Sequence, residues 1–496
     1  MQVTSKSKSE IQEQALKNLI ESHNKKTAKS KQLVQKNRPV LADRSALGIK
    51  FSPNIKEICY PIIIERSQGS RICDVDGNEY VDILMGLGVN LLGHNPPFIK
   101  EAIAQQLEKG IQVGSQTILA AEVAHLVQDL TGMERVTLSN TGTEAIMAAI
   151  RVARTATKRK KIAVFTDSYH GHSDQTLVRA TFAEYAKKAI NRRISERVGD
   201  KGWLSRLVRP LQTQLYHNLN PKAVPAALGI PPSQAKDVLV LEYGNDKSLE
   251  IIKSHRKELA AVLVEPVQSR CPQIQPQAFL NSLRQVTQEA DIALIFDEMV
   301  TGFRIHQGGA QAWFGIEADI VTYSKIAGGG LPLSIIAGKA AYLDGIDGGT
   351  WNFGDDSSPS VETTFFAGTY CKHPLSLAAA KTMLNHLKTE GPTLQEELNQ
   401  KTTKLVTRLN DELESRKKPM RFVNFGSFFA MDLSQSVISP LALSLLSYYL
   451  IGRGVHLRQG DRGGFLSTAH NDDDINFIIQ GFLDSIDDLQ TGGFLE

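Results

Sequence analysis

The chain has 496 residues, of which 42% are hydrophobic and 22% are charged, and its formal net charge at pH 7 is +3. This length supports two or three domain-sized units, and the small net charge argues against nucleic acid or an acidic membrane surface as a partner. The four cysteines form no CxxC pair, which predicts a reducing compartment and no metal site of the zinc type. No apolar run approaches the ~18 residues of a membrane span, and the N-terminal residues lack a secretory pattern, so we expect a cytoplasmic protein.

The first 40 residues are rich in Lys, Ser and Gln, and this composition predicts a flexible tail or linker. One alternative stays open, because Ile11, Ala15 and Leu19 have the spacing of one face of a short docking helix. Residues 41–95 are expected to form the N-terminal part of a small domain. Within them, the sequence GSRICDVDGNEYVD (69–82) indicates a β-hairpin that turns at Asp76 and Gly77.

From about residue 120 to residue 340, helical periodicity alternates with short apolar runs, which indicates an α/β unit around a mostly parallel sheet, and residues 96–374 are expected to form this large domain. Ligands of such sheets bind at the carboxyl ends of the strands. Residues 375–496 predict long helices and a few short strands, and therefore a small α+β domain that residues 41–95 complete. The expected strands of the large domain are residues 136–139, 162–166, 238–242, 260–265, 292–297 and 320–323.

Polar residues follow several of these strands. The motif SNTGTEA (139–145) places Gly142 and Thr143 at the start of a helix, where free N–H groups and hydroxyls suit a phosphate. In YHG (169–171), Tyr169 follows another strand and suits stacking on a flat ring. Taken alone, the first feature is more often an ordinary N-capped helix, and the second is more often a packing residue.

Two charged residues also end strands. Asp297 in IFDEM (295–299) closes an apolar strand, and such a carboxylate needs either solvent or a buried cation, for example a protonated pyridine nitrogen. Lys325 in VTYSKIAGGG (321–330) precedes a glycine run, and a desolvated lysine there suits covalent bonding to a carbonyl group. Thr369 in FAGT (366–369) is a further phosphate candidate. A solvated strand end and a surface lysine are the structural alternatives.

Taken together, in this order and at these spacings, the five motifs resemble class III aminotransferases over roughly residues 60–490. The segment DEMVTGFR (297–304), 28 residues before Lys325, is the most specific part of the resemblance. The resemblance implies a fold type I enzyme that binds pyridoxal 5′-phosphate (PLP) and forms a homodimer, with Lys325, Asp297 and Tyr169 as catalytic residues. In this family pattern, Lys325 holds the cofactor, Asp297 pairs with its ring nitrogen, and Tyr169 and Met299 pack on its two faces. The phosphate would be bound by Gly142 and Thr143, and by Thr369 of the neighbouring subunit.

Two branches of the family share features with the chain. The segments FLSTAHN (465–471) and GSFF (426–429) resemble glutamate-1-semialdehyde aminomutases. Residues 38–51 and 56–61 and the motif EPVQSRCP (265–272) resemble aminotransferase domains of hybrid polyketide/nonribosomal-peptide synthases of the microcystin and iturin type. Arg270 stands where the aminomutase has an asparagine near the phenolic oxygen of the cofactor, which leaves the partner of that oxygen open. Arg270 and His470 are the candidate substrate residues.

Besides these resemblances, the chain has an expansion at about residues 178–222. Residues 187–209 contain eight Lys or Arg residues and two acidic residues, which indicates either a solvated helix face or a basic lid for an acidic acyl carrier protein with its phosphopantetheine arm. We therefore expect an aminotransferase that moves an amino group from glutamate or glutamine to a β-ketoacyl thioester. The alternatives are a glutamate-1-semialdehyde 2,1-aminomutase and a catalytically silent interaction domain with the same fold.

Overall fold

The computed structural model describes residues 7–47, 51–180 and 223–495. The chain divides into two compact units, one formed by Lys109–Lys388 and the other by Met1–Glu108 together with Thr389–Glu496. The expected basic lid lies outside the described residues, apart from its first positions at 178–180. Among the helices of the described residues, none combines the length and the apolar character that a membrane crossing requires.

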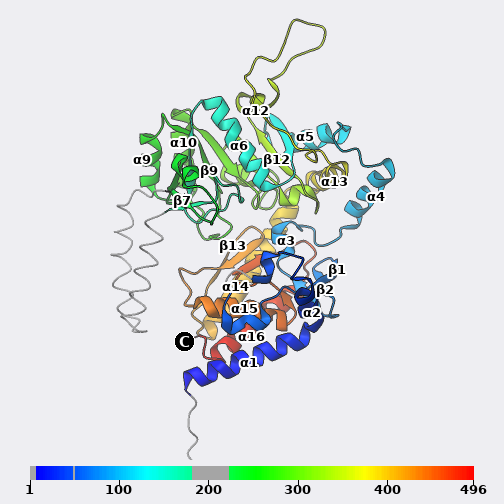
Figure 1. Ribbon diagram of the computed structural model, residues 1–496, viewed down its shortest axis with the longest axis vertical. Coiled ribbons are helices and arrows are strands. Elements are labelled where there is room, and N and C mark those ends of the chain that lie inside the picture. The colour runs from blue at the N-terminus through cyan, green and yellow to red at the C-terminus, as the bar shows by residue number, and fades with distance from the viewer. Residues whose placement is uncertain (1–6, 48–50, 181–222, 496) are drawn as a thin grey trace, which may run out of the picture. The chain divides into compact units, whose positions relative to one another are not determined.

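The unit Lys109–Lys388, the large unit, is an α/β structure (Figure 1). Its helices are α5 (Ile118–Thr131), α6 (Gly142–Thr157), α9 (Asp246–Ser254), α10 (Gln277–Glu289), α11 (Gly309–Phe314), α12 (Ala340–Asp347) and α13 (Pro374–Glu390). Short 3-10 helices are η3 (Pro232–Asp237) and η4 (Lys325–Gly328). Its strands are β4 (Arg135–Ser139), β5 (Lys161–Phe165), β6 (Val178–Ala180), β7 (Ala223–Pro225), β8 (Val238–Leu241), β9 (Leu259–Val264), β10 (Ala293–Asp297), β11 (Ile320–Tyr323) and β12 (Ser334–Gly338).

Seven of these strands form one sheet in the order β4-β12-β11-β10-β9-β5-β8. The pairs β8–β5, β5–β9, β9–β10 and β10–β11 are parallel, whereas β12 is antiparallel to both of its neighbours. Helix α6 packs along one face of this sheet, and its small residues allow close approach: Ala145, Ala149 and Ala153 are each fully buried. The mostly parallel sheet is as predicted, and its fold type I architecture brings the carboxyl ends of β5, β9, β10 and β11 to one edge.

The remaining unit, the small unit, contains both ends of the chain. Its helices are α1 (Lys8–Lys26), α2 (Ala28–Asn37), α3 (Met85–Gly88), α4 (Pro97–Lys109), α14 (Thr393–Ser415), α15 (Pro440–Gly452) and α16 (Asp472–Thr491), with 3-10 helices η1 (Arg44–Leu47) and η2 (Pro53–Ile58). Its strands are β1 (Ile64–Gln68), β2 (Arg71–Asp74), β3 (Glu79–Asp82), β13 (Phe422–Phe425), β14 (Phe428–Met431), β15 (Val455–His456) and β16 (Gly463–Phe465).

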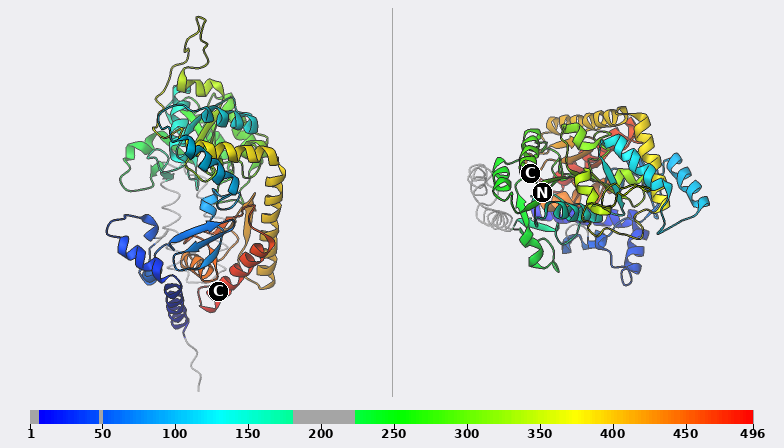
Figure 2. Two further views of the ribbon diagram at one scale, coloured as in Figure 1. Left: turned by 90° about the vertical axis from the view of Figure 1, so that its right-hand side faces the viewer. Right: turned by 90° about the horizontal axis from the view of Figure 1, so that it is seen from above.

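Two small sheets organise this unit, one in the order β1-β2-β3-β15 and the other in the order β13-β14-β16 (Figure 2). Strands β2 and β3 pair antiparallel and turn at Asp76 and Gly77, where Gly77 has φ +88°. Strand β15, which is distant in sequence, then pairs in parallel with β3. Segments 41–95 and 389–496 therefore lie in one unit. Helix α13 instead packs with the large unit, because Gly329 there approaches the carbonyl of Ala379.

The N-terminal residues differ from the prediction of a flexible tail. Residues 8–37 form α1 and α2, and Leu19 and His23 of α1 are buried. The carboxylate of Asp76 in the β2–β3 turn accepts hydrogen bonds from Lys29 N (2.6 Å), Ser30 N (3.0 Å) and Ser30 Oγ (2.8 Å) at the start of α2. The lysine-rich composition reflects the solvent-exposed side of these helices. Their buried side is held by contacts with residues that are distant in the sequence.

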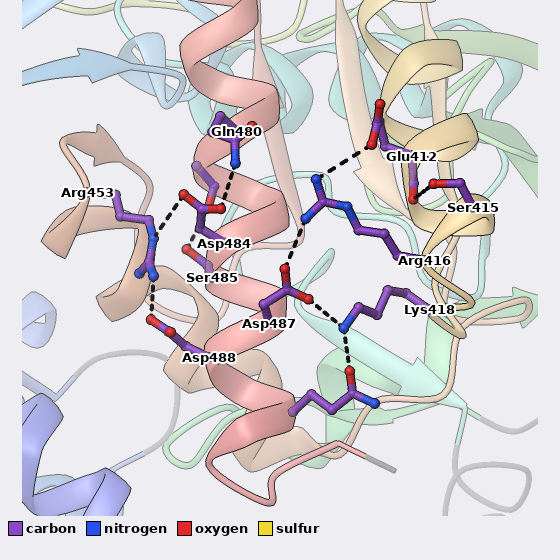
Figure 3. A network of polar contacts seen from close by, with 12 residues as sticks. Glu412, Ser415, Arg416, Lys418, Arg453, Gln480, Asp484, Ser485, Asp487 and Asp488 are labelled. Carbon is purple, nitrogen blue, oxygen red and sulfur yellow. Dashed lines mark hydrogen bonds and ion pairs between the residues drawn. The ribbon is translucent and has the colours of Figure 1, made fainter.

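Ion pairs connect the helices at the C-terminal end of the small unit (Figure 3). Asp487 of α16 contacts Arg416 at 3.0 Å and Lys418 at 2.5 Å, both just after α14. On the other side of α16, Arg453 at the end of α15 contacts Asp484 and Asp488. These partly exposed pairs each contribute little to stability, so their main effect is to fix how α14, α15 and α16 align.

Candidate active site

Lys325 follows β11 and begins the 3-10 helix η4, with a left-handed backbone conformation of φ 37°. Burial lowers the pKa of its ammonium group below the ordinary value, although the carboxylates of Asp297 and Glu265 act in the opposite direction. Two glycines with positive φ, Gly329 and Gly330, then turn the chain away. The strand end therefore presents a desolvated amine that loses its proton more readily than an exposed lysine does, which suits a lysine nucleophile.

Asp297 ends β10, the neighbour of β11, and is 3% exposed. Its Oδ2 lies 2.7 Å from Nδ1 of His170, whose ring is equally buried, and its Oδ1 accepts a hydrogen bond from Met299 N at 3.1 Å. Because an unpaired buried carboxylate is costly, the histidine holds the acid in place and leaves it able to pair with a cation. A protonated pyridine nitrogen is a suitable cation for this position.

The turn between β4 and α6 lies beside these residues. Thr141 caps α6 by accepting from Glu144 N. A Cβ atom on Gly142 would lie 3.0 Å from Sδ of Met299, and a Cβ on Gly171 would lie 2.5 Å from Oγ1 of Thr143. The helix start at Gly142 is therefore packed against Met299 on one side and against the turn after β5 on the other.

Tyr169 and Glu265 join two further strand ends. The Glu265 side chain is 6% exposed, and its Oε2 accepts from the backbone N–H of Tyr169 at 2.9 Å. Burial raises the pKa of Glu265, while His170 acts in the opposite direction. Five segments thus converge in the large unit: the ends of β4, β5, β9, β10 and β11.

The DEMVTGFR motif (297–304) has a structural role as well. Glu298 is fully buried and accepts from Ala310 N (2.5 Å) and Gln311 N (3.0 Å) at the start of α11, and burial raises its pKa to about 7. Gly302 is required because a Cβ there would lie 2.5 Å from the ring of Tyr323. Arg304 is 1% exposed. The segment after Asp297 is therefore packed too tightly for the carboxylate to shift.

The structure brings together Gly142, Thr143, Tyr169, Asp297, Met299 and Lys325 from the predicted residues. Thr369 instead lines a separate cavity of about 640 Å³ in the large unit, together with residues 114–116 and 135–138. His470 belongs to the small unit, where it is fully buried and its Nδ1 contacts Ser467 N at 3.0 Å. A fully buried side chain has no surface for a substrate, so the predicted substrate role of His470 does not fit the structure.

Sequence reasoning missed two residues of the site, His170 and Glu265. Both lie inside the sequence motifs YHG (169–171) and EPVQSRCP (265–272), but the sequence predicted no role for either residue. Glu265, like Asp297, comes at the end of an apolar strand. This shared position is the sequence signal that could have identified Glu265 as a site residue. No sequence pattern indicated that His170 pairs with Asp297, because the ends of β5 and β10 meet at the same edge only in the folded sheet.

These residues fit PLP by their chemistry. The N–H groups of Gly142 and Thr143 at the start of α6 suit its phosphate, the aromatic ring of Tyr169 suits its pyridine ring, and Asp297 suits its protonated nitrogen. Lys325 would bond to its aldehyde. When bound, PLP supplies an electron sink for bonds broken at the substrate carbon.

Comparison with known proteins supports this assignment. The profile described as aminotransferase class-III matches residues 52–198 and 208–461. The glutamate-1-semialdehyde 2,1-aminomutase of Alkaliphilus oremlandii is 32% identical over 444 residues, which cover 87% of this chain and 92% of that enzyme. Glutamate-1-semialdehyde 2,1-aminomutase 2 of Geobacillus kaustophilus is 33% identical over 84% of this chain and 89% of its own length.

Solved structures show the same fold. An omega-transaminase from Sphaerobacter thermophilus has a TM-score of 0.76 and 26% identity, and the match covers 93% of this chain and 98% of that chain. A glutamate-1-semialdehyde aminomutase from Pseudomonas aeruginosa PAO1 has a TM-score of 0.77 at 21% identity, with 97% and 98% covered. The chain belongs to the class III aminotransferases and is a PLP-dependent enzyme of fold type I.

Proposed function

We propose that this enzyme transfers an amino group from an amino-acid donor, glutamate or glutamine, to a β-ketoacyl thioester on a carrier protein. One observation carries the amino-transfer part: a desolvated lysine and a buried, histidine-held carboxylate lie at the ends of the neighbouring strands β11 and β10. The carrier-bound acceptor is the finer part of the proposal. It rests on the resemblance of the motif at 265–272 to the aminotransferase domains of polyketide/peptide synthases.

The roles of the site residues follow from their positions. Asp297, held by His170, would pair with the ring nitrogen of bound PLP and favour its protonated form, and Tyr169 would orient the ring. Burial lowers the pKa of the Lys325 amine, so with PLP bound and the amine released by the donor, its Nζ would take the proton from Cα of the donor and return it at C4′ of the cofactor. The helix start at Gly142 and Thr143 would hold the phosphate of PLP.

An aminomutase is the second candidate, and the curated relatives favour it. Several enzymes named glutamate-1-semialdehyde 2,1-aminomutase are 31–33% identical to this chain over 84–87% of its length. An aminomutase would use the same lysine and aspartate but would return the amino group to the same carbon skeleton. No keto acid would then be released from an external donor.

Product analysis separates the two candidates. Purified enzyme is incubated with L-glutamate or L-glutamine and a β-ketoacyl carrier protein, and the acyl chain is weighed by mass spectrometry. A β-amino product with one equivalent of keto acid supports the proposal. Conversion of glutamate-1-semialdehyde to 5-aminolevulinate without a donor establishes the aminomutase instead. A protein whose visible spectrum does not respond to any of these compounds is the catalytically silent domain.

A further inference from the structure

The segment after β5, residues 166–171, carries Tyr169 on a backbone with an uncommon conformation. Asp167 has φ 63° and Gly171 has φ 81°, so both lie in the left-handed region. For a residue other than glycine this conformation costs free energy, and it persists only where surrounding contacts impose it. Tyr169 itself is 49% exposed, so burial does not fix its position. Contacts made by the backbone of this segment therefore hold the residue.

The turn after β9 supplies such contacts on both sides of Asp167. Before it, the carbonyl of Thr166 accepts a hydrogen bond from Nε2 of Gln268 at 2.7 Å. After it, the N–H of Tyr169 donates to Oε2 of Glu265 at 2.9 Å. Gln268 and Glu265 are 1% and 6% exposed, so water does not compete for these two hydrogen bonds. The turn therefore holds the strained backbone that carries Tyr169.

Glu265 is itself held in place within this turn, which spans residues 265–270. Its Oε1 accepts from Ser269 N (3.4 Å) and Ser269 Oγ (3.2 Å), so both oxygens of the carboxylate are engaged. The carbonyl of Pro266 accepts from the hydroxyl of the buried Tyr243 at 2.6 Å, which fixes the backbone next to Glu265. The reach of this carboxylate therefore determines where the backbone of the tyrosine segment lies.

We propose that Glu265 is a positioning residue that fixes Tyr169 for its contact with the ring of bound PLP. Its carboxylate reaches the backbone N–H of Tyr169, while the guanidinium carbon of Arg270, in the same turn, lies 5.7 Å from the centre of the tyrosine ring. Half of Tyr169 stays exposed, which leaves ring surface for a flat ligand. The inference rests on the PLP contact proposed for Tyr169, and it adds the residue on which that contact depends.

The alternative role of Glu265 is electrostatic, because burial lowers the pKa of Lys325 and the charges of Asp297 and Glu265 raise it. Two variants separate the reach of the side chain from its charge. Glu265→Asp keeps the charge but withdraws the carboxylate by one carbon–carbon bond, whereas Glu265→Gln removes the charge but keeps an acceptor oxygen at full reach. Glu242→Gln is the matched control, because Glu242 is an exposed carboxylate that directly follows β8, the other neighbour of β5.

The probe is 4′-deoxypyridoxine 5′-phosphate, a PLP analogue with a methyl group in place of the aldehyde, which does not bond to Lys325. Calorimetric titration of the PLP-free full-length enzyme gives its Kd. We expect Glu265→Asp to weaken binding about 3- to 10-fold, the contribution of an aromatic stacking contact. Glu265→Gln and Glu242→Gln should stay within about twofold of wild type, because the N–H of Tyr169 keeps its acceptor in both.

A double-mutant cycle shows whether the effect passes through Tyr169. In a Tyr169→Ala background, Glu265→Asp should have no further effect on the Kd, because the ring that Glu265 positions is absent. An undiminished effect in this background would overturn the proposal. Weak binding by Glu265→Gln with normal binding by Glu265→Asp would overturn it in favour of charge, and an equal loss in both variants would overturn it in favour of a general structural role.

Failure of the underlying contact gives a different result. If Tyr169→Ala binds the probe as tightly as wild type does, Tyr169 does not contact the ring of PLP, and the proposal for Glu265 falls with it. The probe takes no part in amino transfer, so these constants do not depend on the donor or the acceptor proposed above. An error in that proposed function is therefore distinguishable from an error in the role of Glu265.

Discussion

Burial and charge act in opposite directions on Lys325. Burial lowers the pKa of its ammonium group, whereas the Asp297 and Glu265 carboxylates raise it, and the net direction is downward. A buried ion pair would stabilise the charged amine, but Asp297 is already engaged by His170. The arrangement keeps the lysine reactive while the acid remains available for the cofactor.

Replacing this lysine tests its role directly. Lys325→Ala should still fold, should lose the visible band of the lysine-bound cofactor, and should lower turnover by at least about 10²–10⁴-fold, the loss expected for an acid–base group. Borohydride reduction followed by peptide mapping should place the cofactor on Lys325 of the wild type. A reduced adduct on another lysine would refute the assignment.

Asp297 offers a second test at the residue scale. Asp297→Asn keeps the size of the side chain and should retain PLP, because the contacts at Gly142 and Thr143 remain. It should slow the single-turnover reaction with donor by at least about 100-fold, because the ring nitrogen no longer has an anionic partner. Stopped-flow absorbance measures this rate, and a rate equal to wild type would show that another group holds the ring proton.

At the scale of elements, the contact between α2 and the β2–β3 turn is unusual because its cap comes from a distant side chain. Asp76→Ala removes the acceptor for the N–H groups of Lys29 and Ser30, at a cost of about 1 kcal/mol. Hydrogen exchange read by mass spectrometry should then be about fivefold faster in α2. Asp76→Asn retains an acceptor oxygen and serves as the control. Unchanged exchange in Asp76→Ala would show that packing alone holds α2.

His23 makes the docking of α1 sensitive to acid. Its ring is 3% exposed and contacts the rings of Tyr60 and Tyr448, and burial lowers its pKa from 6.5 to about 4, with Lys26 and Lys31 adding repulsion. The unfolded chain therefore binds a proton below pH 6.5 that the folded chain does not bind until about pH 4. Stability falls as the pH drops through this window, and this group causes no further loss below it.

A variant isolates this contribution. His23→Phe keeps an aromatic ring but removes the titration, so between pH 7 and pH 5 wild type should lose about 2 kcal/mol more stability than the variant. Urea unfolding at the two pH values measures the difference. Identical pH dependence in both proteins would mean that α1 opens without cost and that His23 is already solvated before unfolding.

The sequence predicted the elements that carry the site better than those that surround them. The strands that end at Asp297 and near Lys325 were found because apolar runs and polar ends are local features, and parallel strands bring such ends together. A docking helix at residues 11–20 was only the alternative to a flexible tail, because the contacts that hold α1 and α2 come from Asp76, α15 and α16, which no local pattern connects to the N-terminal residues. The pairing of His170 with Asp297 was missed for the same reason.

At the scale of the whole molecule, the surface near Thr369 exposes aromatic side chains. Thr369 lines the 640 Å³ cavity of the large unit, and its sequence neighbours Phe365 and Tyr370 are 78% and 59% exposed. The connection between α12 and α13 also extends outward as a long loop, in which Phe353 is 92% exposed (Figure 2). Exposed aromatic side chains of this kind suit an interface with another protein, and a second copy of this chain is the partner that the family pattern implies.

Complementation between inactive subunits tests whether the second copy completes the site. Lys325→Ala and Thr369→Trp, the latter blocking the phosphate position with a bulky ring, should each be nearly inactive alone. In a mixed dimer, isolated with two affinity tags, the intact Lys325 of one subunit meets the intact Thr369 of the other. If Thr369 serves the neighbouring site, one of the two sites is complete, and activity should return to about half of the wild-type value.

The arrangement of the substitutions provides the control. When Lys325→Ala and Thr369→Trp are placed on the same subunit and paired with wild type, neither site has both intact residues, so the mixed dimer should be inactive. If Thr369 serves its own chain, the results reverse: the first mixture stays inactive and the second keeps about half of the activity. Sedimentation of the wild type completes the test, because an active monomer would exclude any shared site.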